Sequence, residues 1–102
     1  MTPLGVLRVT AAEALPFARE KLRACLVVAG LRHVIAGQVT ASVSQALRTR
    51  LPAELAVHLE DGGRYLVLRP PEVAGRYQRL RLPRPAEDVE VEAMRAILAR
   101  LT

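Results

Sequence analysis

The chain has 102 residues, 51% of them hydrophobic, and a formal net charge of +5 at neutral pH. Trp is absent and aromatic residues make up 3%, so a single domain over residues 1–102 with an aliphatic core is expected. No apolar run has the length of a membrane span, no secretory signal opens the chain, and its one Cys excludes an internal disulfide, so we expect a cytoplasmic protein without a membrane partner.

The first third of the chain predicts a short strand followed by a helix. Residues 4–9 have the apolar character of a strand. The helix is expected to start near Ala14, because this leaves Pro16 in the first turn, where proline is tolerated, and to stop at Gly30. We expect Cys25 to be a small core residue rather than a reactive thiol. The predicted buried face consists of Leu15, Ala18, Leu22, Cys25, Leu26 and Ala29.

A second helix is predicted over residues 34–50, ended by Pro52. Gly37 is expected to lie inside it and to weaken it by about 1 kcal/mol relative to Ala. The predicted buried stripe consists of Ile35, Val39, Val43, Ala46, Leu47 and Leu51. The polar positions of the same helix are Ser42, Ser44, Gln45 and Thr49.

A β-hairpin is predicted next, with strands at 54–60 and 64–70 and a glycine-containing turn between them. Pro70 and Pro71 forbid continuation as a paired central strand, so the sheet edge beyond Pro70 is a candidate contact surface. His58 has no Cys, Asp or second His at metal spacing, and the same interpretation applies to His33. We therefore expect half-exposed surface histidines and no metal site.

The last third of the chain predicts a strand at 76–83, with Leu80 and Leu82 facing inward, and a final helix over about 86–102. Acidic residues open this helix and basic residues follow, which favours the helix dipole. Its predicted apolar stripe consists of Val91, Met94, Ile97, Leu98 and Leu101. The order β-α-α-β-β-β-α predicts an α+β two-layer sandwich, with two helices on one face of a mixed or antiparallel sheet.

The positive charge comes almost entirely from arginine, which supplies 14 of the 15 basic residues. Acidic residues are interleaved with the arginines along the chain, which argues against a phosphate-binding track and a nucleic-acid partner. In the densest cluster, Arg79 and Arg81 would share the solvent face of a strand with Tyr77. This face is either a small anion-binding surface or, the interpretation that we favour, an ordinary solvated strand face. The cluster consists of Arg76, Arg79, Arg81 and Arg84.

Two stretches carry a family resemblance. The run KLRACLVVAGLRHVIAGQVTASVSQALRTR at 21–50 has a two-helix pattern, and AELAVHLEDGGRYLVLRP at 53–70 has a hairpin pattern. Together they resemble the start of a GHKL-type (histidine-kinase-like) ATPase domain, in the branch of the anti-sigma-factor and switch-protein serine kinases. The resemblance implies a shortened form of that fold.

The residues that perform the chemistry of the resembled family are replaced here. Its Glu, which orients the attacking water, and its Asn, which holds a magnesium ion, correspond to Gln45 and Thr49. An amide cannot act as a base, and one hydroxyl is a poor metal ligand. The adenine-reading D-x-G-x-G segment corresponds to RPPEVAG at 69–75, which contains no Asp. The resemblance therefore implies a degenerate nucleotide site, with no catalytic residues, no cofactor, no metal and no bound ATP.

The tail EVEAMRAILARLT resembles the segment that leaves N-terminal domains of certain sensor histidine kinases before a coiled coil. It implies a non-catalytic regulatory module of bacterial two-component signalling, which contacts a protein partner or a second copy of itself. The alternatives are a residual ATP-binding serine kinase or anti-sigma factor and an Arg-rich nucleic-acid-binding protein. The final helix either forms a homodimer interface or covers the sheet. The predicted interface residues are Met94, Ile97, Leu98 and Leu101.

Overall fold

The computed structural model describes residues 1–34, 37–70 and 78–100, apart from the side chain of Gln38. Short 3-10 turns at Ala12–Ala14 and Arg32–Val34 precede the first two α-helices. The predicted order of elements is confirmed within these residues. The strands are β1 (Thr2–Val9), β2 (Ala53–Glu60), β3 (Tyr65–Arg69) and β4 (Gln78–Arg81), and the helices are α1 (Leu15–Val28), α2 (Gln38–Thr49) and α3 (Asp88–Ala99).

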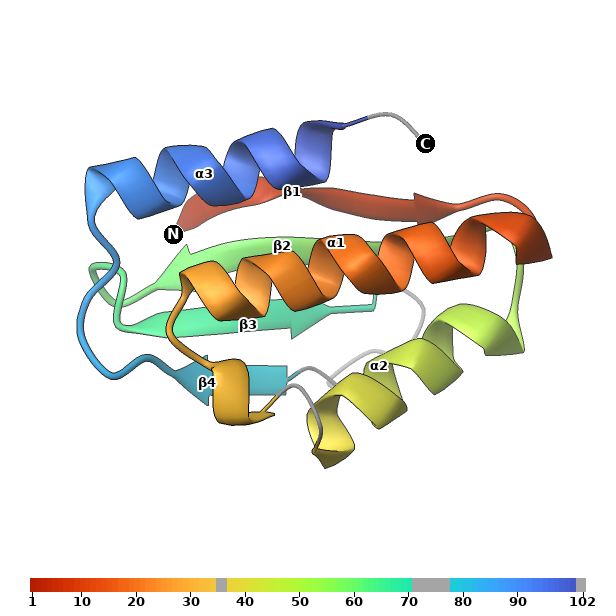
Figure 1. The fold of residues 1–102 in the computed structure, drawn as a ribbon, viewed down its shortest axis with the longest axis horizontal. Helices are drawn as coiled ribbons and strands as arrows, with labels where there is room; N and C mark the ends of the chain where they lie inside the picture. Colours follow the sequence, from red (N-terminus) through yellow and green to blue (C-terminus); the bar gives the residue numbers. More distant parts are fainter. Residues whose placement is uncertain (35–36, 71–77, 101–102) are drawn as a thin grey trace.

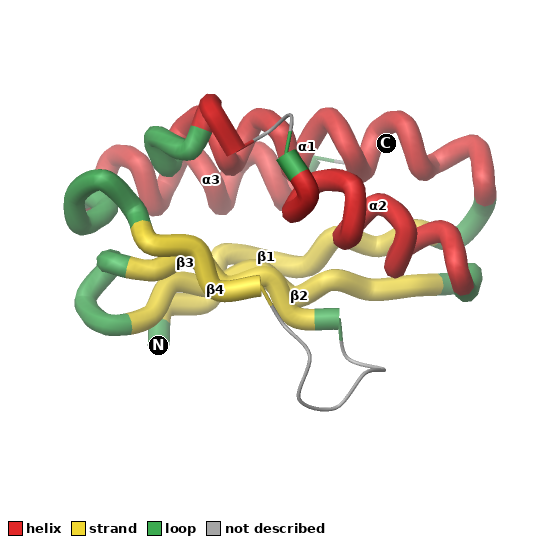
Figure 2. Tube along the Cα trace, turned by 90° about the horizontal axis from the view of Figure 1, so that it is seen from below, coloured by secondary structure: helices red, strands yellow, loops and turns green. Residues whose placement is uncertain are grey.

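The strands form one four-stranded sheet in the order β1-β2-β3-β4, and each neighbouring pair is antiparallel. Figure 2 shows all three helices on the same side of the sheet. The α+β two-layer sandwich is therefore confirmed, with an antiparallel sheet. The expectation of two covering helices is wrong, because α3 packs on β1 and α1 and completes the helical layer (Figure 1).

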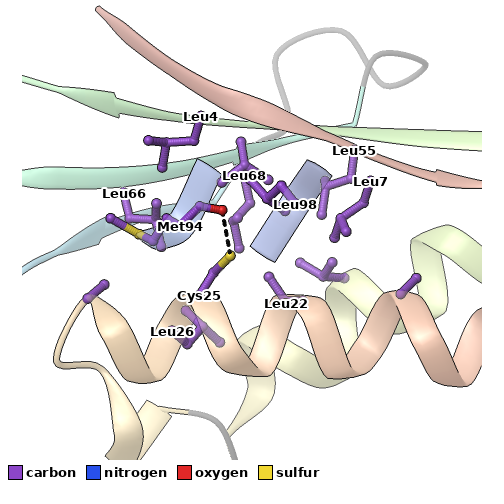
Figure 3. Close-up of a cluster of buried hydrophobic side chains, with 14 of the residues drawn as sticks. Leu4, Leu7, Leu22, Cys25, Leu26, Leu55, Leu66, Leu68, Met94 and Leu98 are labelled. Atoms are coloured by element: carbon purple, nitrogen blue, oxygen red, sulfur yellow. Dashed lines mark hydrogen bonds between the residues drawn. The ribbon is translucent and has the colours of Figure 1, made fainter. Parts of the chain in front are cut away.

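The core lies between the sheet and the helices and is aliphatic, as expected (Figure 3). Alternation along β2 directs Leu55, Val57 and Leu59 inward, and all three are buried. On α1 the predicted face is confirmed, since five of its six residues are buried and Leu15 packs against them. The core side chains drawn with labels in Figure 3 are Leu4, Leu7, Leu22, Cys25, Leu26, Leu55, Leu66, Leu68, Met94 and Leu98.

The second helix begins later than predicted. Gly37 has an extended backbone and is the N-cap of α2, so the prediction that it lies inside the helix is wrong. The residues before it form the 3-10 turn Arg32–Val34. Val43 and Leu47 of the predicted stripe are buried, whereas Ile35 lies outside the described residues.

The hairpin turn and the end of β3 follow the prediction. Gly62 and Gly63 have positive φ angles of 64° and 86°, which glycine adopts without steric cost. β3 ends at Arg69, directly before Pro70. Along its described length β3 is an interior strand, since it pairs with both β2 and β4. The candidate edge beyond Pro70 lies outside the described residues.

Candidate functional site

The candidate site is the face of the sheet that points away from the three helices, which we call the outer face. Strand alternation places every second side chain on it, and the antiparallel register aligns these side chains in rows across the sheet. The described residues of the outer face are Pro3, Val6, Arg8, Glu54, Ala56, His58, Glu60, Tyr65, Val67, Arg69, Arg79 and Arg81.

A connected cluster joins three strands on this face. His58 Nε2 lies 2.9 Å from Oε2 of Glu60, and the ring N–H donates to the carboxylate, which can only accept. The other carboxylate oxygen, Oε1, lies 3.5 Å from Nε of Arg79. The guanidinium of Arg79 also stacks on the ring of Tyr65, 3.6 Å from its centroid. Four side chains therefore hold one another in place on the outer face.

His58 is buried, with 6% of its surface exposed, so the prediction of a half-exposed histidine is wrong. Its neighbour in register, Val67, is fully buried although it points away from the helices. Glu60 supplies the partner that a buried ring N–H needs. The centre of the outer face is therefore packed, and its charged groups surround that centre.

The carboxyl group of Glu60 is held in its ionised form. The hydrogen bond from His58 is the largest cause that lowers its pKa below the ordinary value of 4.5, and the charges of His58 and Arg79 act in the same direction. Partial burial opposes them. The cluster therefore keeps a negative charge between two basic side chains over the neutral pH range.

The outer face carries more positive than negative charge. Arg8 pairs with Glu54 at 3.1 Å and Arg79 pairs with Glu60. Arg69 and Arg81 lie on the same face, so the described residues of this face include four arginines and two glutamates. The prediction that Arg79 and Arg81 share a face is confirmed. The aromatic residue beside them within the described residues is Tyr65, since Tyr77 lies outside these residues.

The remaining predicted arginines lie elsewhere. Arg84 follows β4 and binds the carboxylate of Glu90 at 2.8 Å, at the start of α3. Arg76 lies outside the described residues. His58, Glu60 and Tyr65 were missed as site residues. The signal that could have found them is the spacing His-x-Glu, which puts both side chains on one face of a strand.

The positions that correspond to the nucleotide-binding residues of the resembled family are exposed on α2. The hydroxyl of Thr49 donates to the backbone carbonyl of Gln45 at 2.8 Å, within the helix itself. Ser44 is buried, and Ser42 accepts a hydrogen bond from Gln78 of β4 at 3.2 Å. The polar face of α2 is thus used in part for contact with the sheet.

The predicted interface stripe on α3 lies mainly inside the chain's own core. Met94 is fully buried and Leu98 is 6% exposed, while Ile97 is partly buried against the same core. Leu101 lies outside the described residues. This burial favours the alternative in which α3 covers the sheet, whereas self-association remains a prediction.

Cys25 and the potential metal ligands offer no second site in the part of the chain that the structure describes. Burial raises the pKa of the Cys25 thiol to about 12, and its Sγ lies 3.9 Å from the carbonyl oxygen of Met94 (Figure 3). The expectation that Cys25 is a core residue is confirmed. Residues 1–34, 37–70 and 78–100 contain no group of three His, Cys, Asp or Glu that could hold a metal ion. None of their helices combines the length and apolar character needed to cross a membrane.

Comparison with known proteins gives the outer face no assigned role. The chain matches no protein-family model, no curated protein and no solved structure. The resemblance of residues 21–70 to GHKL-type ATPase domains, and that of the tail to a segment of sensor histidine kinases, therefore remain predictions from the sequence.

Proposed function

We propose that the chain is a non-catalytic regulatory module that binds a protein partner through its outer face. The observation that carries the proposal is the cluster of Tyr65, Arg79, Glu60 and His58 on the face opposite the helices. The core on the other face already holds the strands and helices together. The ordered charges of the outer face are therefore available for recognition.

The partner is a protein with an acidic surface. Arg8 and Arg79 have 71% and 42% of their side-chain surface exposed, and Arg81 is exposed beside them. Aromatic rings and arginines are enriched at protein interfaces because both contribute a large contact area. Glu54 and Glu60 lie among the arginines and would repel a run of phosphates, which favours a protein over a nucleic acid.

The sequence pattern suggests the setting of this module. The two-helix and hairpin pattern of residues 21–70, together with the tail, supports a cytoplasmic domain of bacterial signal transduction at the N-terminus of a sensor histidine kinase. In that setting the kinase activity lies in another part of a larger protein. Binding of the partner to the outer face would then regulate the kinase activity of that larger protein.

The test compares two variants of equal net charge. Arg79→Glu/Arg81→Glu reverses the outer face, and Arg32→Glu/Arg48→Glu reverses two exposed arginines outside it. Each tagged chain is cross-linked in cells, its bound proteins are identified, and the strongest partner is purified for calorimetry. We expect the outer-face variant to bind it at least about tenfold more weakly, as when one charged contact is lost. The control variant should retain the wild-type affinity.

Three results would overturn the proposal. The first is equal binding of the partner by both variants, and the second is capture of nucleic acid with no specific protein. The third is micromolar binding of ATP and magnesium, located by amide shifts at Gln45 or Thr49. That result would instead support a residual ATP-binding kinase or anti-sigma factor. Circular dichroism of both variants verifies that they are folded.

A further inference from the structure

A second candidate site lies where β1, α1 and the end of α3 meet, at the edge of the sheet, and it shares Val6 and Arg8 with the outer face. A pocket of about 410 Å³ opens there. Its volume is within the range of pockets that bind small molecules. We call it the edge pocket, and its lining residues are Leu4, Gly5, Val6, Arg8, Lys21, Arg95, Leu98, Ala99 and Arg100.

The charged residues that line the edge pocket in the described part of the chain are all basic. They are Arg8 from β1, Lys21 from α1, and Arg95 and Arg100 from α3 and the residue after it. Within the described residues, none that lines the pocket carries a carboxylate. Arg8 and Arg95 each have an acidic partner, Glu54 at 3.1 Å and Glu92 at 2.9 Å, outside the lining. Among the residues that the structure describes, these pairs leave Lys21 and Arg100 without a carboxylate partner.

The C-terminus of a helix carries a partial negative charge, which would repel an anion. The positive charge of Lys21 counteracts this repulsion at the end of α3. Its ammonium donates to the carbonyl oxygen of Leu98 at 3.4 Å and to that of Arg100. It also lies 5.2 Å from the ring centroid of Phe17. A full positive charge thus offsets the carbonyl dipoles at the end of α3.

The frame of the edge pocket is held by close packing. A Cβ atom added to Gly5 would lie 2.9 Å from Cβ of Leu98, so the absence of a side chain allows α3 to approach β1. Arg95 fixes the same pair of elements, because its Nε donates to the carbonyl of Pro3 at 3.2 Å. The basic side chains of β1 and α3 therefore project from elements that are held at a fixed distance from each other.

We propose that the edge pocket binds a small amphiphilic anion, which is a carboxylate or a phosphate attached to a short apolar body. The four basic residues would bind the oxyanion, and Leu4, Val6, Leu98 and Ala99 would contact the apolar part. Arginine suits both kinds of oxyanion because its N–H donors form a planar fork. The edge pocket shares Val6 and Arg8 with the outer face, but Arg79 and Arg81, which the test of the proposed function reverses, do not line it.

The test uses hexanoate and hexyl phosphate as probes, with inorganic phosphate and hexanol as controls for the two halves of the ligand. Each is titrated into the ¹⁵N-labelled chain at millimolar concentrations, and amide and arginine Nε shifts are recorded. We expect saturable shifts centred on Gly5, Arg8 and Leu98 for at least one amphiphilic anion. The tighter of the two identifies the oxyanion.

Variants then assign the binding to the edge pocket. Arg8→Gln/Arg100→Gln should weaken the probe about tenfold, as when one charged hydrogen bond is lost. Arg32→Gln/Arg48→Gln removes the same charge elsewhere and should leave the affinity unchanged. The proposal is overturned by unsaturable shifts, by hexanol or inorganic phosphate binding as tightly as the amphiphilic anions, or by equal loss in both variants. These titrations use the isolated chain without a protein partner, so their outcome does not depend on binding of a partner to the outer face.

Discussion

The two faces of the sheet differ in the interactions that their side chains make. On the inner face, Leu66 and Leu68 of β3 are fully buried against the helices, in contact with an aliphatic core. On the outer face, Tyr65 of the same strand is stacked under Arg79, which also pairs with Glu60. One strand thus carries the fold on one side and a charged cluster on the other.

The inner face is expected to contribute most of the folding stability, and the outer face to contribute to binding of a partner. Burial of a large aliphatic side chain contributes about 1.5–3 kcal/mol to the free energy of unfolding, whereas an exposed ion pair contributes about 0–1 kcal/mol. Changes at the exposed charged side chains of the outer face should therefore have small effects on folding and large effects on binding. Changes on the inner face should have the opposite effect. The predictions below test this division.

The largest expected effect concerns the reactivity of Cys25 in the core. With a pKa of about 12 in place of 9.0, its thiolate fraction at a pH below both values is roughly a thousandfold lower. Alkylation by iodoacetamide at pH 8 should therefore be negligible in the folded chain and rapid in urea. The measurement is the modified fraction by mass spectrometry over time. Rapid alkylation of the folded chain would show that the core opens.

The second prediction compares Leu66 on the inner face of β3 with Arg79 on the outer face of the neighbouring strand β4. Leu66→Ala should lower the free energy of unfolding by about 2–5 kcal/mol, because it removes buried methyl groups and leaves a cavity. The measurement is urea unfolding followed by circular dichroism. A domain of this size has a total stability of roughly 5–15 kcal/mol, so the shift in the midpoint should be large.

The matched variant on the outer face is Arg79→Ala. It should lower the free energy of unfolding by about 1 kcal/mol or less, since it removes an exposed stack on Tyr65 and a partly exposed ion pair with Glu60. The same urea titration applies. A loss as large as that of Leu66→Ala would contradict the division, because the outer cluster would then hold the fold.

The smallest predicted effect is a change of pH dependence. The pKa of Glu60 is lower in the folded chain than its ordinary value of 4.5, so the unfolded chain binds more protons in acid. The stability that it contributes is present above that value and is lost as the pH falls through the lowered pKa. Glu60→Gln should therefore flatten the acid side of the stability profile, as measured by urea unfolding at several pH values.

A double variant verifies the cause of this pH dependence. If the hydrogen bond from His58 is the main reason for the lowered pKa of Glu60, His58→Gln should flatten the same part of the profile. Combining the two substitutions should flatten it no further than Glu60→Gln alone. Additive effects of the two substitutions would show that the two groups act independently.

The sequence predicted the order of the elements and most of the inner face, because helix and strand periods are local signals. The stripe of α1 and the alternation Leu55, Val57 and Leu59 follow directly from these periods. The position of Gly37 was wrong because a short 3-10 turn before α2 resembles the start of the helix in sequence. The boundaries of an element depend on whether the chain forms a turn or an α-helix at its ends, and the sequence pattern does not distinguish the two.

The candidate sites were less predictable because they depend on distant contacts. Alternation placed His58 on the polar side of β2, but its burial depends on neighbours such as Glu60 and on strand pairing across the sheet. The edge pocket joins Arg8 to Arg100, which are brought together by packing of α3 on β1. The periodicity of a single helix or strand does not show which distant residues come into contact.

The central claim is that the outer face, and not the helical layer, contacts a protein partner. A photoreactive amino acid introduced at Arg81 on the outer face, and separately at Arg48 on α2, tests it directly in cells. Both positions are exposed, so access to the probe is comparable. We predict a specific protein adduct at position 81 and none at position 48. An adduct formed at position 48 alone, or the absence of any adduct at position 81, would contradict the account.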